Sequence, residues 1–466
     1  MKLATPLGAV LVVVVVLVAG SSGLASAQPF RKGPMLQSVD ATSGVLLWES
    51  SESLPARVVV AVAGVAGAPA RELAGPATRL HEVRIDGLAP GTRHTWRVEC
   101  GGETATGELI TAPLGPQPFT FVVFGDSRTG HEPHRALVAR IRDEAPAFVL
   151  GTGDMVFDGG VPDDWQKFFD IERALLAERP LFPAVGNHDL DAMTLSADAY
   201  RQWFALPGGS PMPERIYAFT WAGVRVLVLD SNGGAIPAGD QTAWLEDELQ
   251  AAAFDQQIEH VFVALHHPIY STATHGGHAG LREAWGPLFE RYGVDAVFSG
   301  HDHLYEHLEQ NGVRYFVSGG GGAPLYRRNP LASAVDVAAS VLLDRSHHYL
   351  RVQVAGGAVE VTAIRVDGSI IETTTWGDER RRERARVAAR DARATAAAPS
   401  ARTERAVGPA LRPGRTAGGC GAGGCSVGRC SVGGAGAGAG GGSLLVVLLL
   451  LARVRFGRGS SVRRPA

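Results

Sequence analysis

The sequence predicts an α/β domain preceded by a smaller all-β domain, on the evidence of two different patterns of apolar residues. From Phe119 onward, short apolar runs alternate with segments of helical periodicity, which is typical of an α/β domain. Before Pro113, β-rich runs follow one another with turn residues between them and no helical segment. With 45% hydrophobic and 20% charged residues, the 466-residue chain has the composition of a globular protein.

The smaller domain is predicted as a β-sandwich over residues 30–112, and nothing in it indicates chemistry. The turn sequence Leu88–Thr92 (LAPGT) precedes its last strand, and Pro113–Pro118 (PLGPQP) forms a linker after it. Its expected strands lie at residues 45–49, 57–62, 82–85 and 95–99.

The α/β domain is predicted over residues 119–376. Its expected helices lie at residues 134–144, 165–177, 242–253 and 281–292. Its expected buried strands lie at residues 120–124, 147–150, 181–185, 225–229, 261–265, 296–298 and 314–317. Three later strands, at residues 349–354, 359–366 and 370–375, are expected to close the domain as an antiparallel ribbon.

Residues 1–27 have the layout of a secretory signal peptide. Lys2 precedes an apolar run at 10–18, and Ala25-Ser26-Ala27 forms a small-residue exit. A retained membrane anchor is the weaker alternative, because the apolar run is shorter than the roughly 20 residues that a span needs. We therefore expect a secreted or cell-surface protein that starts near Gln28.

The C-terminal part is predicted as a tail outside the folded domains. Residues 377–443 are expected to form a disordered stalk, rich first in Arg and Ala and then in Gly and Cys. Residues 444–466 follow as an aliphatic run and a basic end, a layout that resembles bacterial sorting signals of the MYXO-CTERM kind. That resemblance implies membrane or envelope attachment through the tail, and a low-complexity tail without an anchoring role is the alternative. The cysteines in the tail are compatible with a disulfide in an exported protein, whereas Cys100 is alone in the body of the chain.

The charge is distributed unevenly along the chain. Residues 377–466 hold 17 Arg and five acidic residues, a net charge of +12, whereas residues 3–376 hold 26 basic and 42 acidic residues, a net charge of −16. An acidic body of this size argues against a nucleic-acid scaffold as partner, because such binding requires a cationic face.

Five predicted strands end in polar turns whose side chains are typical metal ligands. Ligands bind where the carboxyl ends of strands meet in an open α/β sheet, so these side chains are expected to converge. Carboxylate, amide and imidazole groups together favour Zn, Mn or Fe over Ca or Mg. Each turn alone is weak evidence, since Asp126 is also suited to cap a helix, but five in order are strong evidence. The turns are Gly125-Asp126-Ser127-Arg128, Gly153-Asp154, Gly186-Asn187-His188-Asp189, His266-His267-Pro268 and Gly300-His301-Asp302-His303.

The order of these turns resembles the calcineurin-like metallophosphoesterases, across roughly residues 119–320. With the β-domain in front, which is similar to fibronectin type III modules, the chain most resembles the purple acid phosphatases over most of residues 30–376. The resemblance implies a four-layer αββα sandwich and a site with two divalent or trivalent metal ions, Fe, Zn or Mn. Carried over by position, Asp126 and His303 would bind the first metal and Asp154 would bridge both. Asn187, His266 and His301 would then bind the second metal.

The resemblance also implies roles for residues around the metals. His188 would contact the phosphate or protonate the leaving oxygen, as a general acid does, and Asp189 would orient it. His275, nine residues after His266, matches a position where the purple enzymes carry a further His, and His278 is a weaker candidate. His267 is expected to be structural or to support the ligands.

Two residues depart from the family pattern. Phe157 stands where the purple enzymes have the tyrosine that gives the colour, so we predict a colourless protein. Arg128 stands where many other members have a His ligand, so the first metal has one protein ligand fewer. Arg128 would clamp the phosphate of the substrate, since guanidinium matches phosphate oxygens bidentately. An ion pair with a nearby acid is an equally good reading.

The function that the sequence predicts is that of an exported phosphoesterase of the acid-phosphatase kind. It would hydrolyse small-molecule phosphate monoesters by attack of metal-bound hydroxide. A phosphodiesterase or nucleotidase is the alternative within this class. A surface protein that binds metal or phosphate without turnover is the alternative outside it.

Overall fold

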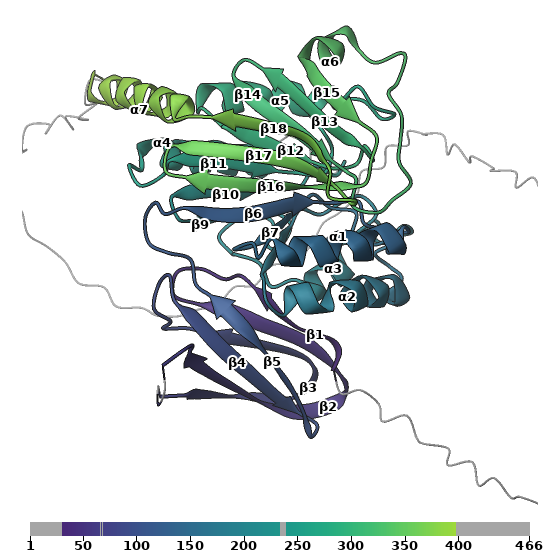
Figure 1. The fold of residues 1–466 in the computed structure, drawn as a ribbon. Helices are drawn as coiled ribbons and strands as arrows, with labels where there is room; N and C mark the ends of the chain where they lie inside the picture. The colour runs from purple at the N-terminus through teal and green to yellow at the C-terminus, as the bar shows by residue number, and fades with distance from the viewer. Residues whose placement is uncertain (1–29, 66, 68, 234–238, 398–466) are drawn as a thin grey trace, which may run out of the picture. The chain divides into compact units, whose positions relative to one another are not determined.

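The computed structural model describes residues 30–65, 67, 69–233 and 239–397, with side chains described up to residue 390 (Figure 1). The predicted signal peptide at 1–27 and the predicted tail from residue 398 onward lie outside the described residues. Within the described part of the chain, no helix combines the length and the apolar character needed to cross a membrane.

The N-terminal region is all-β, as predicted, and is built on one long strand. Strand β2 has 19 residues and joins the two strands predicted at 45–49 and 57–62. Its first half pairs with β1, its second half pairs with β4, and β3 pairs along both halves. Alternate residues of the sheet, such as Trp48, Val58 and Trp96, are buried. The strands are β1 Phe30–Gln37, β2 Gly44–Val62, β3 Arg71–Ile85, β4 Arg93–Cys100 and β5 Glu103–Ile110.

Residues after the linker form two mixed sheets with helices on their outer sides, the predicted four layers. The six-stranded sheet has the order β18-β17-β16-β6-β7-β8, and the seven-stranded sheet has the order β15-β13-β14-β12-β11-β10-β9. Phe121 of β6 lies 5.7 Å from Phe262 of β11 and 6.3 Å from Phe298 of β12, measured between ring centroids, so the two sheets share one aromatic core.

The bounds of these elements are as follows. The six-stranded sheet contains β6 Phe119–Phe124, β7 Val149–Gly151, β8 Leu181–Pro183, β16 His348–Ala355, β17 Ala358–Arg365 and β18 Ile370–Trp376. The seven-stranded sheet contains β9 Tyr217–Trp221, β10 Val224–Val228, β11 His260–Ala264, β12 Ala296–Ser299, β13 Tyr305–Gln310, β14 Val313–Ser318 and β15 Ser340–Asp344. The helices are α1 His131–Asp143, α2 Pro162–Leu176, α3 Asp198–Trp203, α4 Asp240–Phe254, α5 Ala279–Arg291, α6 Ala334–Ala339 and α7 Glu379–Ala397.

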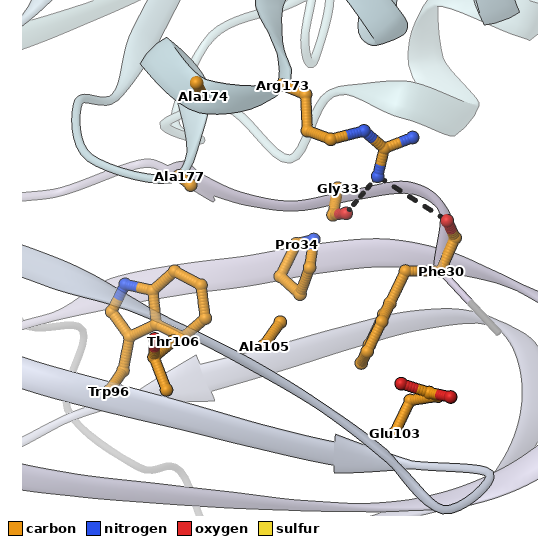
Figure 2. A pocket seen from close by; sticks show the side chains of 10 residues that line it. All are labelled: Phe30, Gly33, Pro34, Trp96, Glu103, Ala105, Thr106, Arg173, Ala174 and Ala177. Atoms are coloured by element: carbon orange, nitrogen blue, oxygen red, sulfur yellow. Dashed lines mark hydrogen bonds between the residues drawn. The ribbon is translucent and has the colours of Figure 1, made fainter. Parts of the chain in front are cut away.

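The N-terminal sheet contacts the α/β layers through helix α2. The Arg173 guanidinium of α2 donates a hydrogen bond to the Gly33 carbonyl in β1 at 3.0 Å. Figure 2 shows this contact beside a cavity of about 670 Å³, which Pro34 and Trp96 help to line. The Gln37 amide donates to the Trp203 carbonyl at 2.8 Å, so β1 also contacts α3.

The expectation of a disordered stalk from residue 377 is wrong for residues 379–397, which form helix α7. Arg384 is only 2% exposed and donates to the Gly293 carbonyl at 2.6 Å and to the Asp295 carboxylate at 2.9 Å. Val387 and Ala388 lie on the same side of the helix. A buried arginine with a buried acid as partner holds this helix, and composition alone does not reveal such a pair.

We predict that His348 makes the protein less stable in acid. This imidazole is fully buried, with Nδ1 2.9 Å from the Ser346 carbonyl and Nε2 3.2 Å from Ser318 Oγ. Burial lowers the pKa of His348 to about 4, against about 6.5 in an unfolded chain. The unfolded state therefore binds more protons between these values, and stability falls as the pH drops through them.

The expected loss from His348 is on the order of 3 kcal/mol between pH 6.5 and pH 4. Urea unfolding at several pH values, on wild type and on His348→Gln, would measure it as the difference between the two pH slopes. Equal slopes for the two proteins would show that His348 does not titrate in this way.

Candidate metal centre

The six predicted metal ligands come from turns at the carboxyl ends of strands in both sheets. Asp126, Asp154 and Asn187 follow the parallel strands β6, β7 and β8 of one sheet. His266, His301 and His303 follow β11 and β12, parallel neighbours in the other. The structure brings these six side chains together at one edge of the stacked sheets.

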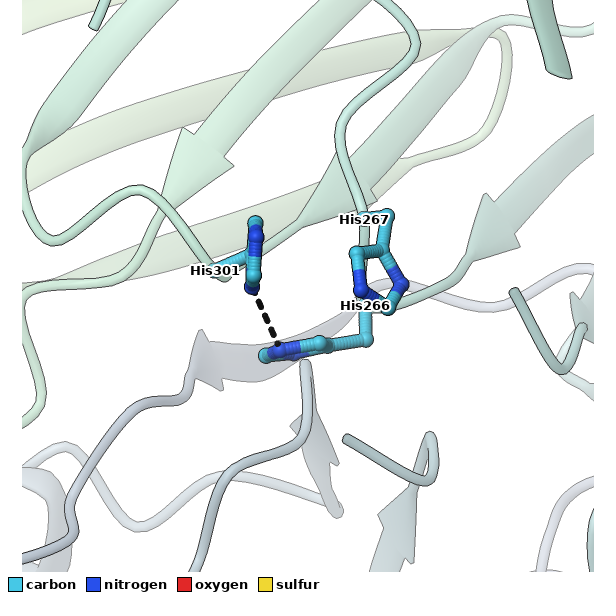
Figure 3. Close-up of side chains that lie close together, drawn as sticks. All are labelled: His266, His267 and His301. Carbon is cyan, nitrogen blue, oxygen red and sulfur yellow. Dashed lines mark hydrogen bonds between the residues drawn. The ribbon is translucent and has the colours of Figure 1, made fainter. Parts of the chain in front are cut away.

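One half of the site gathers Asn187, His266 and His301. Asn187 Oδ1 lies 3.1 Å from His266 Nε2 and 3.1 Å from His301 Nδ1. The two imidazole nitrogens are 3.2 Å apart. Figure 3 marks this contact between the two rings with a dashed line. Asp154 Oδ1 lies 3.3 Å from His266 Nε2, so the carboxylate of Asp154 borders this group.

The protonation of these imidazoles suits a cation. His266 Nδ1 donates to the Thr152 carbonyl at 2.8 Å, which leaves Nε2 with a lone pair directed at Asn187 and His301. Burial lowers the pKa values of His266 and His301 far below the ordinary value, and the neighbouring histidines lower them further. Amide oxygen and imidazole nitrogen atoms that lie this close to one another are suited to share a metal ion.

The other half of the site gathers Asp126 and His303. Asp126 Oδ1 lies 3.4 Å from His303 Nε2, and His303 Nδ1 donates to the Pro324 carbonyl at 2.8 Å. The carbonyl again directs the opposite nitrogen into the site. Ligand-type atoms of Asp126, Asp154 and His266 all lie within 4.8 Å of one another, which links the two halves.

Three of the predicted ligands have left-handed backbone conformations. The φ angles are 58° at Asp126, 55° at Asp154 and 67° at His301, a region that is uncommon for residues with a Cβ. Such conformations collect at functional sites, because the surrounding structure must hold them. The glycines before these residues allow the turns to meet: a Cβ on Gly125 would lie 2.0 Å from Thr152 Oγ1, and one on Gly300 would lie 2.3 Å from Asp126 Oδ2.

The prediction that Asp189 orients the imidazole of His188 is wrong. The Asp189 carboxylate accepts hydrogen bonds from the backbone N–H groups of Gly186 at 2.8 Å, Asp154 at 2.9 Å and Met155 at 2.8 Å. His188 Nδ1 instead donates to the Phe157 carbonyl at 2.7 Å. Burial raises the pKa of Asp189 to about 7, and the charge of Asp154 adds to this. Asp189 thus connects the turn after β7 to the turn after β8 through hydrogen bonds to their backbones.

The structure places Arg128 against the predicted bridging ligand. Arg128 Nε donates to Asp154 Oδ2 at 3.2 Å, and Arg128 Nη2 lies 3.4 Å from His303 Nε2. The backbone N–H of His188 donates to Asp154 Oδ1 at 2.9 Å, so both residues border the site. The ion pair that the sequence left open is thus present, with a predicted ligand as the acid.

The other histidines that the sequence analysis named differ in how close they lie to the candidate metal centre. The ring of His275 lies 4.3 Å from the ring of His301, so His275 borders the site. A ring nitrogen of His267 lies within 4.8 Å of ligand-type atoms of His266 and His301, while His267 Nδ1 lies 2.8 Å from Ser231 Oγ. His278 instead caps helix α5, because its Nδ1 accepts from the Leu281 N–H at 3.3 Å.

Sequence reasoning missed one aromatic residue at the site. The ring of Tyr326 stacks on His303 at 4.0 Å and lies 5.3 Å from His275. The Tyr326 N–H also donates to the His303 carbonyl at 2.9 Å. No local pattern marks Tyr326, since it lies in an irregular loop after β14 and reaches the site only through the fold.

Comparisons with known proteins agree with this geometry. Residues 119–305 match the family model described as Calcineurin-like phosphoesterase. An uncharacterized protein of Mycobacterium tuberculosis is 32% identical over 266 residues, which cover 49% of this chain and 50% of that protein. Purple acid phosphatase 21 of Arabidopsis thaliana is 28% identical over 260 residues, covering 52% of this chain and 58% of its own. The chain thus spans about half the length of the curated relatives it matches.

Solved structures show the same fold at low sequence identity. The purple acid phosphatase from yellow lupin (Lupinus luteus) seeds superposes with a TM-score of 0.64 at 16% identity, covering 75% of each chain. A structure of PhoD superposes with a TM-score of 0.59 at 14% identity, covering 76% of this chain and 91% of that one. Residues 119–305 therefore resemble a calcineurin-like phosphoesterase domain, and the relatives of this chain include purple acid phosphatases.

Proposed function

We propose that this protein is a dinuclear-metal phosphoesterase that hydrolyses small-molecule phosphate monoesters. The observation that carries the proposal is the convergence of two buried carboxylates, one amide and three imidazoles from two sheets, with lone pairs directed at common points. Hydrogen bonds to carbonyls fix two of these imidazoles in the ligand tautomer. This donor set suits Zn, Mn or Fe.

In this proposal the six ligands divide between two ions. Asp126 and His303 would hold the first metal, and Asn187, His266 and His301 would hold the second. Asp154 would contact both, because its oxygens border both halves of the site. Bound ions would supply Lewis-acid polarisation of the phosphoryl group and a more acidic water molecule.

The chain's own residues would bind the ester and move the proton. Arg128 is a fixed cation beside Asp154 and would bind phosphoryl oxygens. His188 Nδ1 donates a hydrogen bond to the Phe157 carbonyl, so Nε2 is the ring atom that would give a proton to the leaving oxygen. Water adds to phosphorus and gives up a proton, and the bond from phosphorus to the leaving oxygen breaks. The leaving oxygen would take a proton from Nε2 of His188 in its doubly protonated form, and the proton lost by the water would restore that form. The products are an alcohol or phenol and inorganic phosphate.

Assays on one monoester and one diester, with Mn-, Zn- and Fe-loaded protein, would test the proposal. Turnover of the monoester supports it. Faster turnover of the diester would favour the phosphodiesterase or nucleotidase alternative. Bound metal without turnover of either ester would favour a surface protein that binds metal or phosphate.

We predict that removing the metals abolishes turnover reversibly. Dialysis against a chelator is expected to lower phosphatase activity to background, and added Zn²⁺ or Mn²⁺ should restore it. Ligands that bind only the folded state also stabilise it, so the melting temperature should fall and recover together with activity. Full activity in protein shown by elemental analysis to be metal-free would contradict the proposed centre.

We further predict that the iron-loaded protein has no visible tyrosinate absorption band. Phe157 has no hydroxyl group to act as a ligand, and its ring lies 5.5 Å from that of His188 at the edge of the site. Absorption spectra of iron-loaded wild type and Phe157→Tyr would be compared, with a new band expected only in the variant. A visible charge-transfer band in the wild type would show that another phenol, such as Tyr326, binds the metal.

The proposals for location rest on the sequence. We propose export on the evidence of residues 1–27 and surface attachment on the evidence of residues 444–466. N-terminal sequencing of protein from the medium or the cell envelope would test the first, with a start near Gln28 expected. The fibronectin III-like nature of residues 30–112 also stays a prediction.

A further inference from the structure

A second cavity, of about 240 Å³, lies beside the candidate metal centre. Its walls come from the turn after β6, the start of α1, the turn after β7, and α2. The residues that matter for its chemistry are Arg128, His131, Met155, Phe157, Lys167 and Phe168.

The cavity and the metal centre share two residues. Arg128, whose guanidinium bonds to Asp154, forms part of the cavity wall. Phe157 also lines the cavity, while its carbonyl accepts from His188 Nδ1 and its ring lies 5.9 Å from the Arg128 guanidinium. A phosphoryl group bound by Arg128 would therefore carry its ester substituent next to this cavity.

The lining combines an apolar surface with positive charge. Met155, Phe157 and Phe168 supply side chains on which a flat ring packs. Arg128 and Lys167 supply cationic groups, and Asp164 is the acid in the lining. Lys167 Nζ donates to Asp164 at 3.1 Å, which uses one of its three donors.

We propose that this cavity binds the leaving group of the substrate, and that this leaving group is a single aromatic ring with an anionic substituent. The inference rests on the proposed function, since it assigns a substrate class to the same reaction. The volume lies below the roughly 300 Å³ at which pockets begin to hold drug-sized ligands, so it suits one ring rather than a nucleoside. In the reaction water bonds to phosphorus, the bond from phosphorus to the ring oxygen breaks, and the ring oxygen takes a proton from His188. A phenol leaves, and inorganic phosphate is the other product.

Binding of phosphonates, which cannot be hydrolysed, tests the cavity without depending on turnover or on leaving-group reactivity. Calorimetry on metal-loaded protein would compare methylphosphonate, phenylphosphonate and 4-carboxyphenylphosphonate. Phenylphosphonate is expected to bind about tenfold more tightly than methylphosphonate, because the ring leaves water. The carboxyl group is expected to add about a threefold gain through one partly exposed ion pair.

Two variants test the cationic part and the apolar part of the cavity lining separately. Lys167→Gln should remove the gain from the carboxyl group and leave phenylphosphonate binding unchanged. Phe157→Ala, at a ring that is 54% exposed and not needed for the core, should reduce the preference for the ring. Arg135→Gln, an exposed cation on α1 paired with Glu132, is the matched control and should change neither preference.

The outcomes distinguish this inference from the proposed function. Equal affinity for the three phosphonates in a protein that hydrolyses esters would overturn the inference alone. In a protein without turnover, a ring preference that Phe157→Ala reduces and a carboxyl gain that Lys167→Gln removes would support the cavity and overturn the proposed function. A ring preference that Phe157→Ala does not change would place the ring elsewhere and overturn the inference.

Discussion

Replacing Asp154 with asparagine is expected to lower kcat/KM for a phosphate monoester by about a thousandfold or more. Asp154 is buried, its Oδ1 lies 3.3 Å from His266 Nε2, and its Oδ2 accepts from Arg128. A ligand-type atom of Asp154 also lies within 4.8 Å of one from Asp126 and one from His266, so Asp154 lies between the two halves of the site. An amide has nearly the same shape but no negative charge, so the variant should fold while holding metal weakly.

The measurement is kcat/KM together with the metal content of the purified variant. Asp247→Asn, an exposed position on α4, is the matched control and should keep both values. A low metal content with a normal melting curve in excess metal would locate the defect in the site. Retention of wild-type activity by Asp154→Asn would remove the basis for a bridging carboxylate.

The strand-end turns explain why the sequence could predict much of the site. A glycine followed by a ligand-type side chain after a buried strand is a local pattern, and the parallel order of β6, β7 and β8 turns that pattern into proximity. The crowding at Gly125 and Gly300 gives the physical reason for glycine there. These features depend on a few residues that are neighbours in the chain, so they can be predicted from the sequence without knowledge of the fold.

The role of Asp189 could not be predicted in the same way. Adjacent residues suggested that Asp189 serves His188, but their side chains point to different partners. The partners of Asp189 at Asp154 and Met155 are 35 and 34 residues away in the chain. Only the packing of the turns after β7 and β8 brings these residues together. The spacing of residues within each turn does not indicate that packing.

Elements held by distant partners were also missed. Helix α7 depends on Arg384 and its buried partner Asp295, which lie 89 residues apart. Strand β13 follows the His303 turn directly and pairs with β14 and β15, and neither β13 nor β15 shows enough regular alternation to be predicted alone. In each case tertiary pairing outweighs local propensity.

Replacing Asp189 with alanine is expected to destabilise the protein by about 4 kcal/mol, because four buried backbone N–H groups lose their acceptor. Two of these groups belong to Gly186 and Asp154, in the turns that carry the proposed metal ligands Asn187 and Asp154. The loss should therefore lower metal affinity as well as the free energy of unfolding.

Asp191→Ala is the matched control, because Asp191 lies in the same turn but caps only the exposed N–H groups of Met193 and Thr194. Urea unfolding and metal titration of both variants would separate the two roles, with a much smaller effect expected for Asp191→Ala. The free energy of unfolding and the metal affinity of Asp189→Asn should lie between those of wild type and Asp189→Ala. The amide has a single acceptor oxygen, which can accept from only some of the backbone N–H groups. If Asp189→Ala lost activity at unchanged stability and metal affinity, Asp189 would instead act directly on the substrate or on His188.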